Sequence, residues 1–89
     1  MAVHQLLPNF VMGDAVSCHA MDIQEVLRER GIEAHIYAPQ ADAYGRHHGR
    51  PDAEYPEYMG REEDLLIFHY LIYCDNYEMY LESRNRKVL

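Results

Sequence analysis

A glycine turn between an apolar run and an amphipathic stretch constrains this fold more than any other feature of the chain. Residues 2–8 are mostly apolar and predict a strand. Past Gly13 and Asp14, apolar residues recur at the helical period over 15–30, and Gly31 stands where a helix commonly ends. The turn therefore predicts the passage from a first strand into a first helix, with Asp14 able to cap that helix.

Three later segments predict further strands. Residues 33–38 form a short strand candidate, and a strand, a helix and a strand in this order predict a parallel pair. Residues 65–71 are apolar almost without a break, as in a strand buried on both faces. We expect an α/β fold with flanking helices at 15–30 and roughly 76–84. Its parallel sheet of about four strands should be ordered 33–38, 2–8, 65–71, 86–89.

The chain has 89 residues, which is enough for one domain with a modest core. Within the single domain 1–89, residues 40–63 hold three glycines and two prolines and predict a surface loop excursion. A formal net charge of −7 argues against nucleic acid and anionic membranes as partners. No apolar run reaches the roughly 18 residues of a membrane span, and no signal peptide is evident. A cytoplasmic location is the expectation.

The turn is the first candidate binding site. The carboxyl end of a parallel strand is where ligands bind in such folds, and the positive end of a helix favours an anion. Gly13, Asp14, Ala15 and Val16 are therefore candidate substrate-binding residues. The alternative is that Gly13 and Asp14 form only a turn and a helix cap, because one glycine is a much weaker signal than a Gly-rich phosphate fingerprint.

His69 is the candidate catalytic residue, because it lies near the end of the apolar strand 65–71. A neutral imidazole there can donate to a substrate hydroxyl or phosphate. The alternative is a core histidine with one hydrogen bond. The adjacent His47 and His48 match no metal-binding spacing, so no metal is expected. Cys18 is expected to be a buried helical thiol.

Five segments, in this order and spacing, resemble the N-terminus of a family 4 retaining glycosyltransferase of the GT-B type. They are His4-Gln5-Leu6-Leu7-Pro8, Gly13-Asp14-Ala15-Val16, Leu27-Arg28-Glu29-Arg30-Gly31, Ile36-Tyr37-Ala38, and Asp64-Leu65-Leu66-Ile67-Phe68-His69-Tyr70. The resemblance covers nearly the whole chain. It implies two Rossmann-like domains facing a cleft, of which the first binds the acceptor and the second binds most of the nucleotide-sugar.

By position, Gly13 and Asp14 match that family's first glycine loop, and His69 matches its cleft histidine. The resemblance implies a nucleotide-sugar donor and an acceptor of unknown identity as partners, and no cofactor. The chain would be a truncated GT-B N-terminal domain that is inactive alone, because the donor domain is missing. Bare sheet edges would favour self-association. The rival hypothesis is a free-standing small α/β module that binds a partner or an anion without catalysis.

Overall fold

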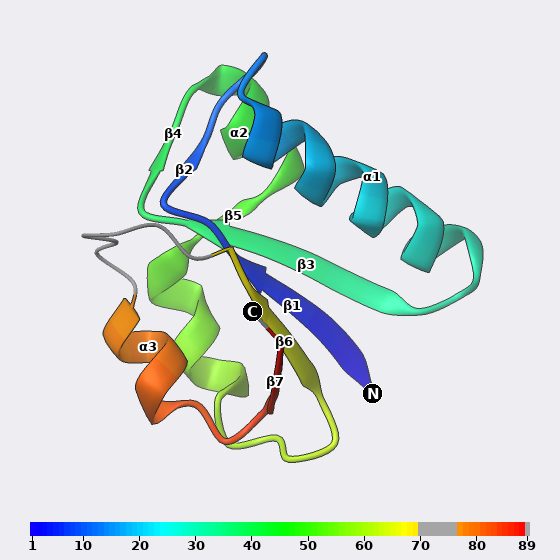
Figure 1. The fold of residues 1–89 in the computed structure, drawn as a ribbon, viewed down its shortest axis with the longest axis vertical. Coiled ribbons are helices and arrows are strands. Elements are labelled where there is room, and N and C mark those ends of the chain that lie inside the picture. Colours follow the sequence, from blue (N-terminus) through cyan, green and yellow to red (C-terminus); the bar gives the residue numbers. More distant parts are fainter. Residues whose placement is uncertain (70–76, 89) are drawn as a thin grey trace.

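The computed structural model describes residues 1–69 and 77–88, and it confirms an α/β fold built on a parallel sheet (Figure 1). Its strands are β1 (Ala2–Leu6), β3 (Glu33–Ala38), β5 (Arg50–Pro51), β6 (Leu65–Phe68) and β7 (Arg86–Val88). They pair in the order β5-β3-β1-β6-β7, and every pair is parallel. The predicted order of four strands is therefore confirmed, and β5 adds a short fifth strand at one edge.

The other elements surround this sheet. A separate pair of short parallel strands is formed by β2 (Asn9–Phe10) and β4 (Gln40–Ala41). The helices are α1 (Ala15–Glu29), α2 (Ala43–His48), the 3-10 helix η1 (Asp52–Tyr58) and α3 (Tyr77–Glu82). The predicted first strand 2–8 ends earlier, at Leu6, before Pro8, which has no backbone N–H for the ladder. The predicted end of the 65–71 strand lies outside the described residues.

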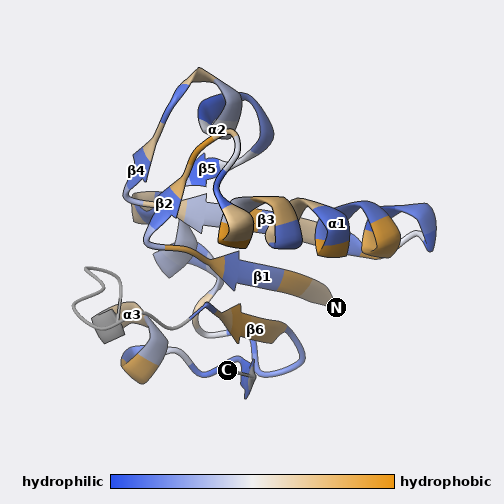
Figure 2. Ribbon diagram, turned by 45° about the horizontal axis from the view of Figure 1, so that its top comes forward, coloured by the Kyte–Doolittle hydropathy of each residue, from blue (hydrophilic) through white to orange (hydrophobic). Residues whose placement is uncertain are grey.

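Two hydrophobic cores cover the two faces of the sheet. The core under α1 contains Leu7, Phe10, Ala20, Met21, Ile36 and Ala38. The opposite core, under η1 and α3, contains Leu6, Tyr37, Tyr55, Leu66 and Phe68. Figure 2 shows the hydrophobic side of α1 and the strongly hydrophobic β6 within this layered arrangement. The fold is therefore a Rossmann-like sheet between two helical layers.

Both ends of α1 depend on a glycine with positive φ. Gly13 has φ +84° and Gly31 has φ +76°, values that residues with a Cβ rarely adopt. Asp14 caps the helix, since its carboxylate accepts from the backbone N–H of Ser17 at 3.0 Å. The expectation of a buried Cys18 is wrong, because this thiol is exposed. The helix turns Ser17, not its neighbour, toward the sheet, and Ser17 is fully buried.

A buried histidine–aspartate pair connects three strands of the sheet. His4, at the centre of β1, is fully buried, and its Nε2 donates to Oδ2 of Asp64 at 2.8 Å. The hydroxyl of Tyr37 on β3 donates to Nδ1 of His4 at 3.1 Å. The backbone N–H of Ala2 reaches the second carboxylate oxygen of Asp64 at 2.9 Å. Asp64 directly precedes β6, so one carboxylate anchors β6 beside β1 while His4 holds β3.

Burial sets the protonation of this pair. Desolvation lowers the pKa of His4 below its ordinary value, despite the opposing effect of Asp64. Burial alone would raise the pKa of Asp64, but the hydrogen bonds from His4 and from the backbone of Ala2 hold it below its usual value. A neutral imidazole therefore faces an ionised carboxylate, and both imidazole nitrogens are used.

A second buried network attaches the chain after α3 to η1. The hydroxyl of Tyr55 lies 2.6 Å from both Oγ of Ser83 and Oδ1 of Asn85. The Asn85 amide donates in turn to the carbonyl oxygens of Tyr58 and Arg61. Burial raises the pKa of Tyr55 to about 12, so the hydroxyl stays protonated and can donate. These bonds fix the approach to β7.

Residues 40–63 are more regular than the surface excursion that their composition predicts. They contain β4, α2, β5 and η1. Two glycines allow α2 to lie directly against Phe10: a Cβ at Gly45 would overlap the carbonyl oxygen of Phe10, and one at Gly49 would lie 2.7 Å from its ring. Phe10 itself is 1% exposed. Two of the three glycines that suggest a loop are thus packing positions, one within α2 and one at its end.

The substitution Gly45→Ala tests this contact. Alanine ordinarily favours a helix over glycine, but here the added Cβ must displace backbone, so we expect a loss of about 1–3 kcal/mol in the free energy of unfolding. Urea denaturation measures it. Gly60→Ala is the matched control, because a Cβ at Gly60 meets nothing within 4 Å. Equal stability of Gly45→Ala and the unaltered chain would contradict the packing described.

Candidate functional site

The order of the strands places a topological switch point between β1 and β6. From β1 the chain moves through α1 to β3 and then to β5, and it returns through η1 to β6 on the other side of β1. Successive connections therefore leave in opposite directions at the carboxyl ends of β1 and β6. Ligands of open α/β sheets bind in the crevice outside such a point.

His69 lies at this switch point, directly after β6. Its backbone N–H donates to the carbonyl oxygen of Leu6 at 3.1 Å, and its Nε2 lies 2.8 Å from Oε1 of Gln5. Gln5 is fully buried, and its own amide donates to the carbonyl oxygen of Ala20 at 3.0 Å. That second bond fixes which end of the Gln5 amide faces His69. Nε2 of His69 therefore carries the hydrogen, and Nδ1 is the acceptor.

The surroundings of His69 keep it neutral. Burial lowers its pKa below the ordinary value, and the neighbouring His19 on α1 lowers the pKa further. The two rings meet edge to face, with centroids 6.1 Å apart. A neutral, oriented imidazole can accept a hydrogen bond or a proton from a ligand hydroxyl. The sequence pointed to His69, but neither Gln5 nor His19 was singled out.

The loop before α1 is held by side chains of the chain itself. Oγ of Ser17 accepts from the backbone N–H of Val11 and donates to the carbonyl oxygen of Asn9. The N–H of Met12 donates to Oδ2 of Asp42 at 3.0 Å. The carboxylate of Asp14 accepts from the N–H of Ser17 and so caps the helix. Of the four predicted binding residues, Asp14 thus has a local structural partner.

The amides of Gly13, Ala15 and Val16 are the donors that this loop can offer to a ligand. Within the described part of the chain, none of the three has a hydrogen-bond acceptor. Two carboxylates lie beside them, however, those of Asp14 and Asp42. Hydrogen bonds from Gly45 and Met12 hold the pKa of Asp42 below its usual value, so it is ionised at neutral pH. The loop is therefore a weaker anion site than the helix dipole alone predicts.

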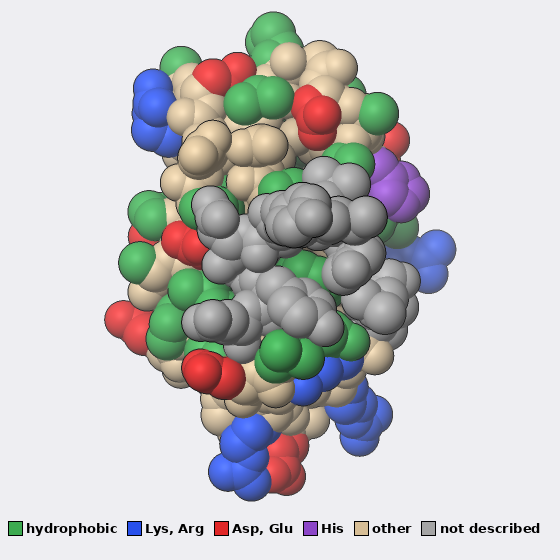
Figure 3. Space-filling view, turned by 60° about the vertical axis from the view of Figure 1, so that its left-hand side comes forward, with side chains coloured by type: hydrophobic (Ala, Val, Ile, Leu, Met, Phe, Trp, Pro, Cys, Tyr) green, Lys and Arg blue, Asp and Glu red, His purple; other side chains and the backbone are tan. Residues whose placement is uncertain are grey.

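His69 directly follows β6 at the carboxyl edge of the sheet, whereas Gly13 lies beyond β1 and comes after the short strand β2. The ring of His69 lies against that of His19 on α1, while Gly13 lies in the loop between β2 and α1. Figure 3 shows hydrophobic and acidic side chains of the described residues beside one another on this side of the molecule, with Lys and Arg mostly toward its rim. A crevice shared by Gly13 and His69 stays a prediction.

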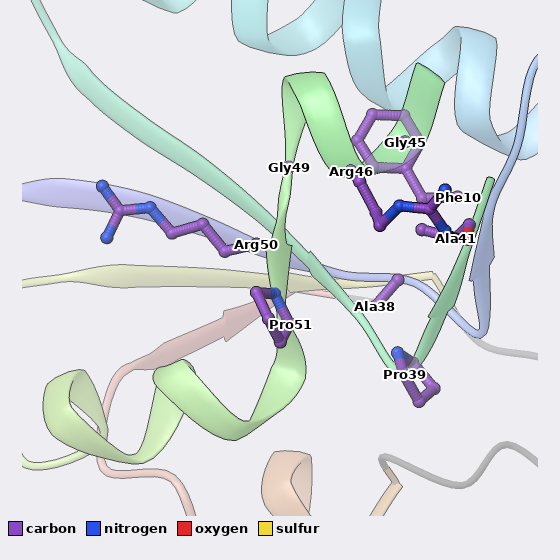
Figure 4. A pocket seen from close by; sticks show the side chains of 9 residues that line it. All are labelled: Phe10, Ala38, Pro39, Ala41, Gly45, Arg46, Gly49, Arg50 and Pro51. Atoms are coloured by element: carbon purple, nitrogen blue, oxygen red, sulfur yellow. Dashed lines mark hydrogen bonds between the residues drawn. The ribbon is translucent and has the colours of Figure 1, made fainter. Parts of the chain in front are cut away.

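A cavity of about 420 Å³ lies at the carboxyl end of β3, a volume in the range of small-molecule sites. Figure 4 shows Arg46 extending from α2 across it toward Phe10 and Ala41. Nη1 of Arg46 donates to the carbonyl oxygen of Ala41 at 2.9 Å. Apart from Arg46 and Arg50, the lining is apolar or glycine: Phe10, Ala38, Pro39, Ala41, Gly45, Gly49 and Pro51. Sequence reasoning missed this cavity, because α2 was expected to be loop.

Neither a metal centre nor a membrane helix is found within residues 1–69 and 77–88. These residues contain no group of three or more His, Cys, Asp or Glu that could hold a metal ion. None of their helices combines the length and the apolar character needed to cross a bilayer. No model of a known protein family, no curated protein and no solved structure matches the chain. Function is therefore inferred from the geometry of the site and from the resemblance of its motifs.

The variant His19→Gln tests the electrostatics of His69. Removing the second imidazole should raise the pKa of His69, because His19 lowers it. The pKa should stay below its ordinary value, since burial, the larger cause, remains. Proton NMR of the His69 ring across a pH series measures this, with His47→Gln on α2 as the control. An unchanged or lower pKa in His19→Gln would contradict the arrangement.

Proposed function

We propose that this chain is the acceptor-side, Rossmann-like part of a GT-B-type retaining glycosyltransferase of family 4, which transfers a sugar from a nucleotide-sugar to an acceptor. The observation that carries the proposal is His69, held by Gln5 at the switch point of the sheet. A histidine after the apolar strand β6 and a glycine loop after the first strand are the two features that the resemblance requires. The neutral, oriented ring of His69 and the loop amides without acceptors support the proposal.

In this proposal the loop amides of Gly13, Ala15 and Val16 lie against the leaving diphosphate, where preorganised donors stabilise developing charge. Nδ1 of the neutral His69 accepts a hydrogen bond from a sugar hydroxyl and orients it. The cavity beneath Arg46 would take the acceptor, whose apolar part fits Phe10 and Ala38 while Arg46 meets a polar or anionic group.

The same proposal implies that the chain alone transfers no sugar. Transfer needs the anomeric carbon, the acceptor hydroxyl and the diphosphate held together, and such positioning supplies on the order of 7–11 kcal/mol of barrier reduction. One sheet with an open edge cannot enclose a nucleotide-sugar. Asp14 and Asp42 repel its diphosphate, so cations for it must come from a second domain.

The second candidate function is a binding module without catalysis. The observation that favours it is that the carboxylates of Asp14 and Asp42 lie at the loop. A site that binds a nucleotide-sugar without help from another domain would have cationic side chains there. In this alternative the cavity beneath Arg46 is the main site. It would bind an apolar ligand with one anionic group, and nucleotide-sugars would not compete.

Titration with UDP-glucose and GDP-mannose tests the first proposal. We expect binding no tighter than about 1 mM, weakened by Gly13→Val by about fivefold or more, and no turnover. Gly31→Val is the matched control, because it imposes the same positive-φ strain at the other end of α1.

Equal weakening in both valine variants would mean that strain, not contact, reduces binding, and would contradict the role of the loop. Turnover of labelled nucleotide-sugar by the purified chain, lost in His69→Ala, would overturn the claim of inactivity. Binding of neither nucleotide-sugar would favour the binding module.

A further inference from the structure

The outer edge of β3 is only half covered by its neighbouring strand. β5 pairs with Tyr37 and Ala38, and among the described strands none pairs with the first part of β3 on that side. The end of α1 and the end of α2 border this uncovered part. Between them lies a second cavity of about 330 Å³, distinct from the one beneath Arg46.

Side chains that can carry positive charge dominate this second cavity. It is lined by Arg28, His35, Ile36, His47, His48, Gly49 and Arg50. Two arginines and three histidines thus gather in one place on a chain whose formal net charge is −7. Such a local reversal of sign is what a site for an anion requires.

The two guanidinium groups are held in position. Nη2 of Arg28 donates to the carbonyl oxygen of Ala34 at 2.8 Å. Nη1 of Arg50 lies 3.4 Å from the hydroxyl of Tyr58, and Figure 4 shows the Arg50 side chain directed away from the cavity beneath Arg46. Each guanidinium has five N–H groups, so one such bond orients it and leaves others for a ligand.

The imidazoles are also fixed by neighbours. The ring of His48 packs at 4.6 Å from Tyr44, and the rings of His47 and His48 meet edge to face at 4.7 Å. His35 has its Nε2 2.7 Å from Oε2 of Glu33. Each imidazole carries one N–H donor when neutral and two when protonated, so the cluster can supply donors to an anion.

Two carboxylates lie near the cavity, and their negative charge opposes the positive charge of its lining. Glu33 contacts His35, and Glu54 lies 3.9 Å from Arg50. Their side chains are 54% and 48% exposed, so water screens both. Neither residue is part of the cavity lining.

We propose that this cavity is a binding site for a phosphate group, either free inorganic phosphate or the phosphate of a small monoester. A tetrahedral dianion suits two guanidinium forks, which match its oxygens with paired N–H donors. The cavity, at about 330 Å³, has room for the phosphate and for the rest of a small monoester, and imidazole N–H groups can add donors. The site lies at the edge of β3, across β1 and β3 from His69, so it does not depend on the glycosyltransferase proposal.

Isothermal titration at constant ionic strength, set with sodium chloride, tests the site. The probes are inorganic phosphate and glycerol 3-phosphate. We expect dissociation constants of about 0.1–5 mM, raised at least about fivefold by Arg28→Gln and by Arg50→Gln. Tighter binding of the monoester identifies an organic phosphate as the ligand, and equal binding identifies the phosphate group alone.

Arg30→Gln is the matched control. It removes the same charge from the same end of α1, but Arg30 is not part of the cavity lining. Affinity retained in Arg30→Gln and lost in Arg28→Gln supports the site. Equal loss in both variants would show a response to net charge only and would overturn it, as would the absence of heat at 50-fold the upper expected constant. Urea denaturation of each variant confirms that the folded chain is compared.

Discussion

The buried pair of His4 and Asp64 is the interaction on which the rest of the structure depends. A single carboxylate, 2% exposed, binds the imidazole of β1 and the first amide of the same strand, and it directly precedes β6. Removing one partner would leave a buried charge or donor without compensation, which is far more costly than losing an exposed ion pair. Because the pair fixes β6 beside β1, it also fixes the switch point at which His69 and Gln5 meet.

The order of the strands could be predicted from the sequence, because each feature that determines it lies within one short stretch of the chain. The Gly13 and Gly31 turns bound α1, and the unbroken apolar run before His69 marks the central strand β6, in which Leu66 and Phe68 are buried and the alternate residues are partly buried. His69 could be selected because its place after that run is a matter of chain order. Self-association and a shared crevice for Gly13 and His69 stay predictions.

The features that the sequence did not reveal depend on contacts between distant residues. Gly45 and Gly49 resemble loop residues until Phe10 is seen against them. The orientation of His69 depends on Gln5, 64 positions earlier, and Asp42 reaches the first glycine loop from 30 positions away. The prediction of a buried Cys18 was wrong because helical periodicity shows which face of a helix is buried, but it does not decide whether a residue at the border of that face is buried or exposed.

The central proposal is that nucleotide-sugars bind where the loop before α1 meets the carboxyl edge of the sheet. Mapping of backbone amide and histidine ring NMR shifts during titration with UDP-glucose tests it most directly. The account predicts that the amides of Gly13, Ala15 and Val16 and the ring of His69 shift together, along one saturation curve. Shifts confined to residues around Arg28 and Arg50, or shifts of the loop without His69, would contradict it.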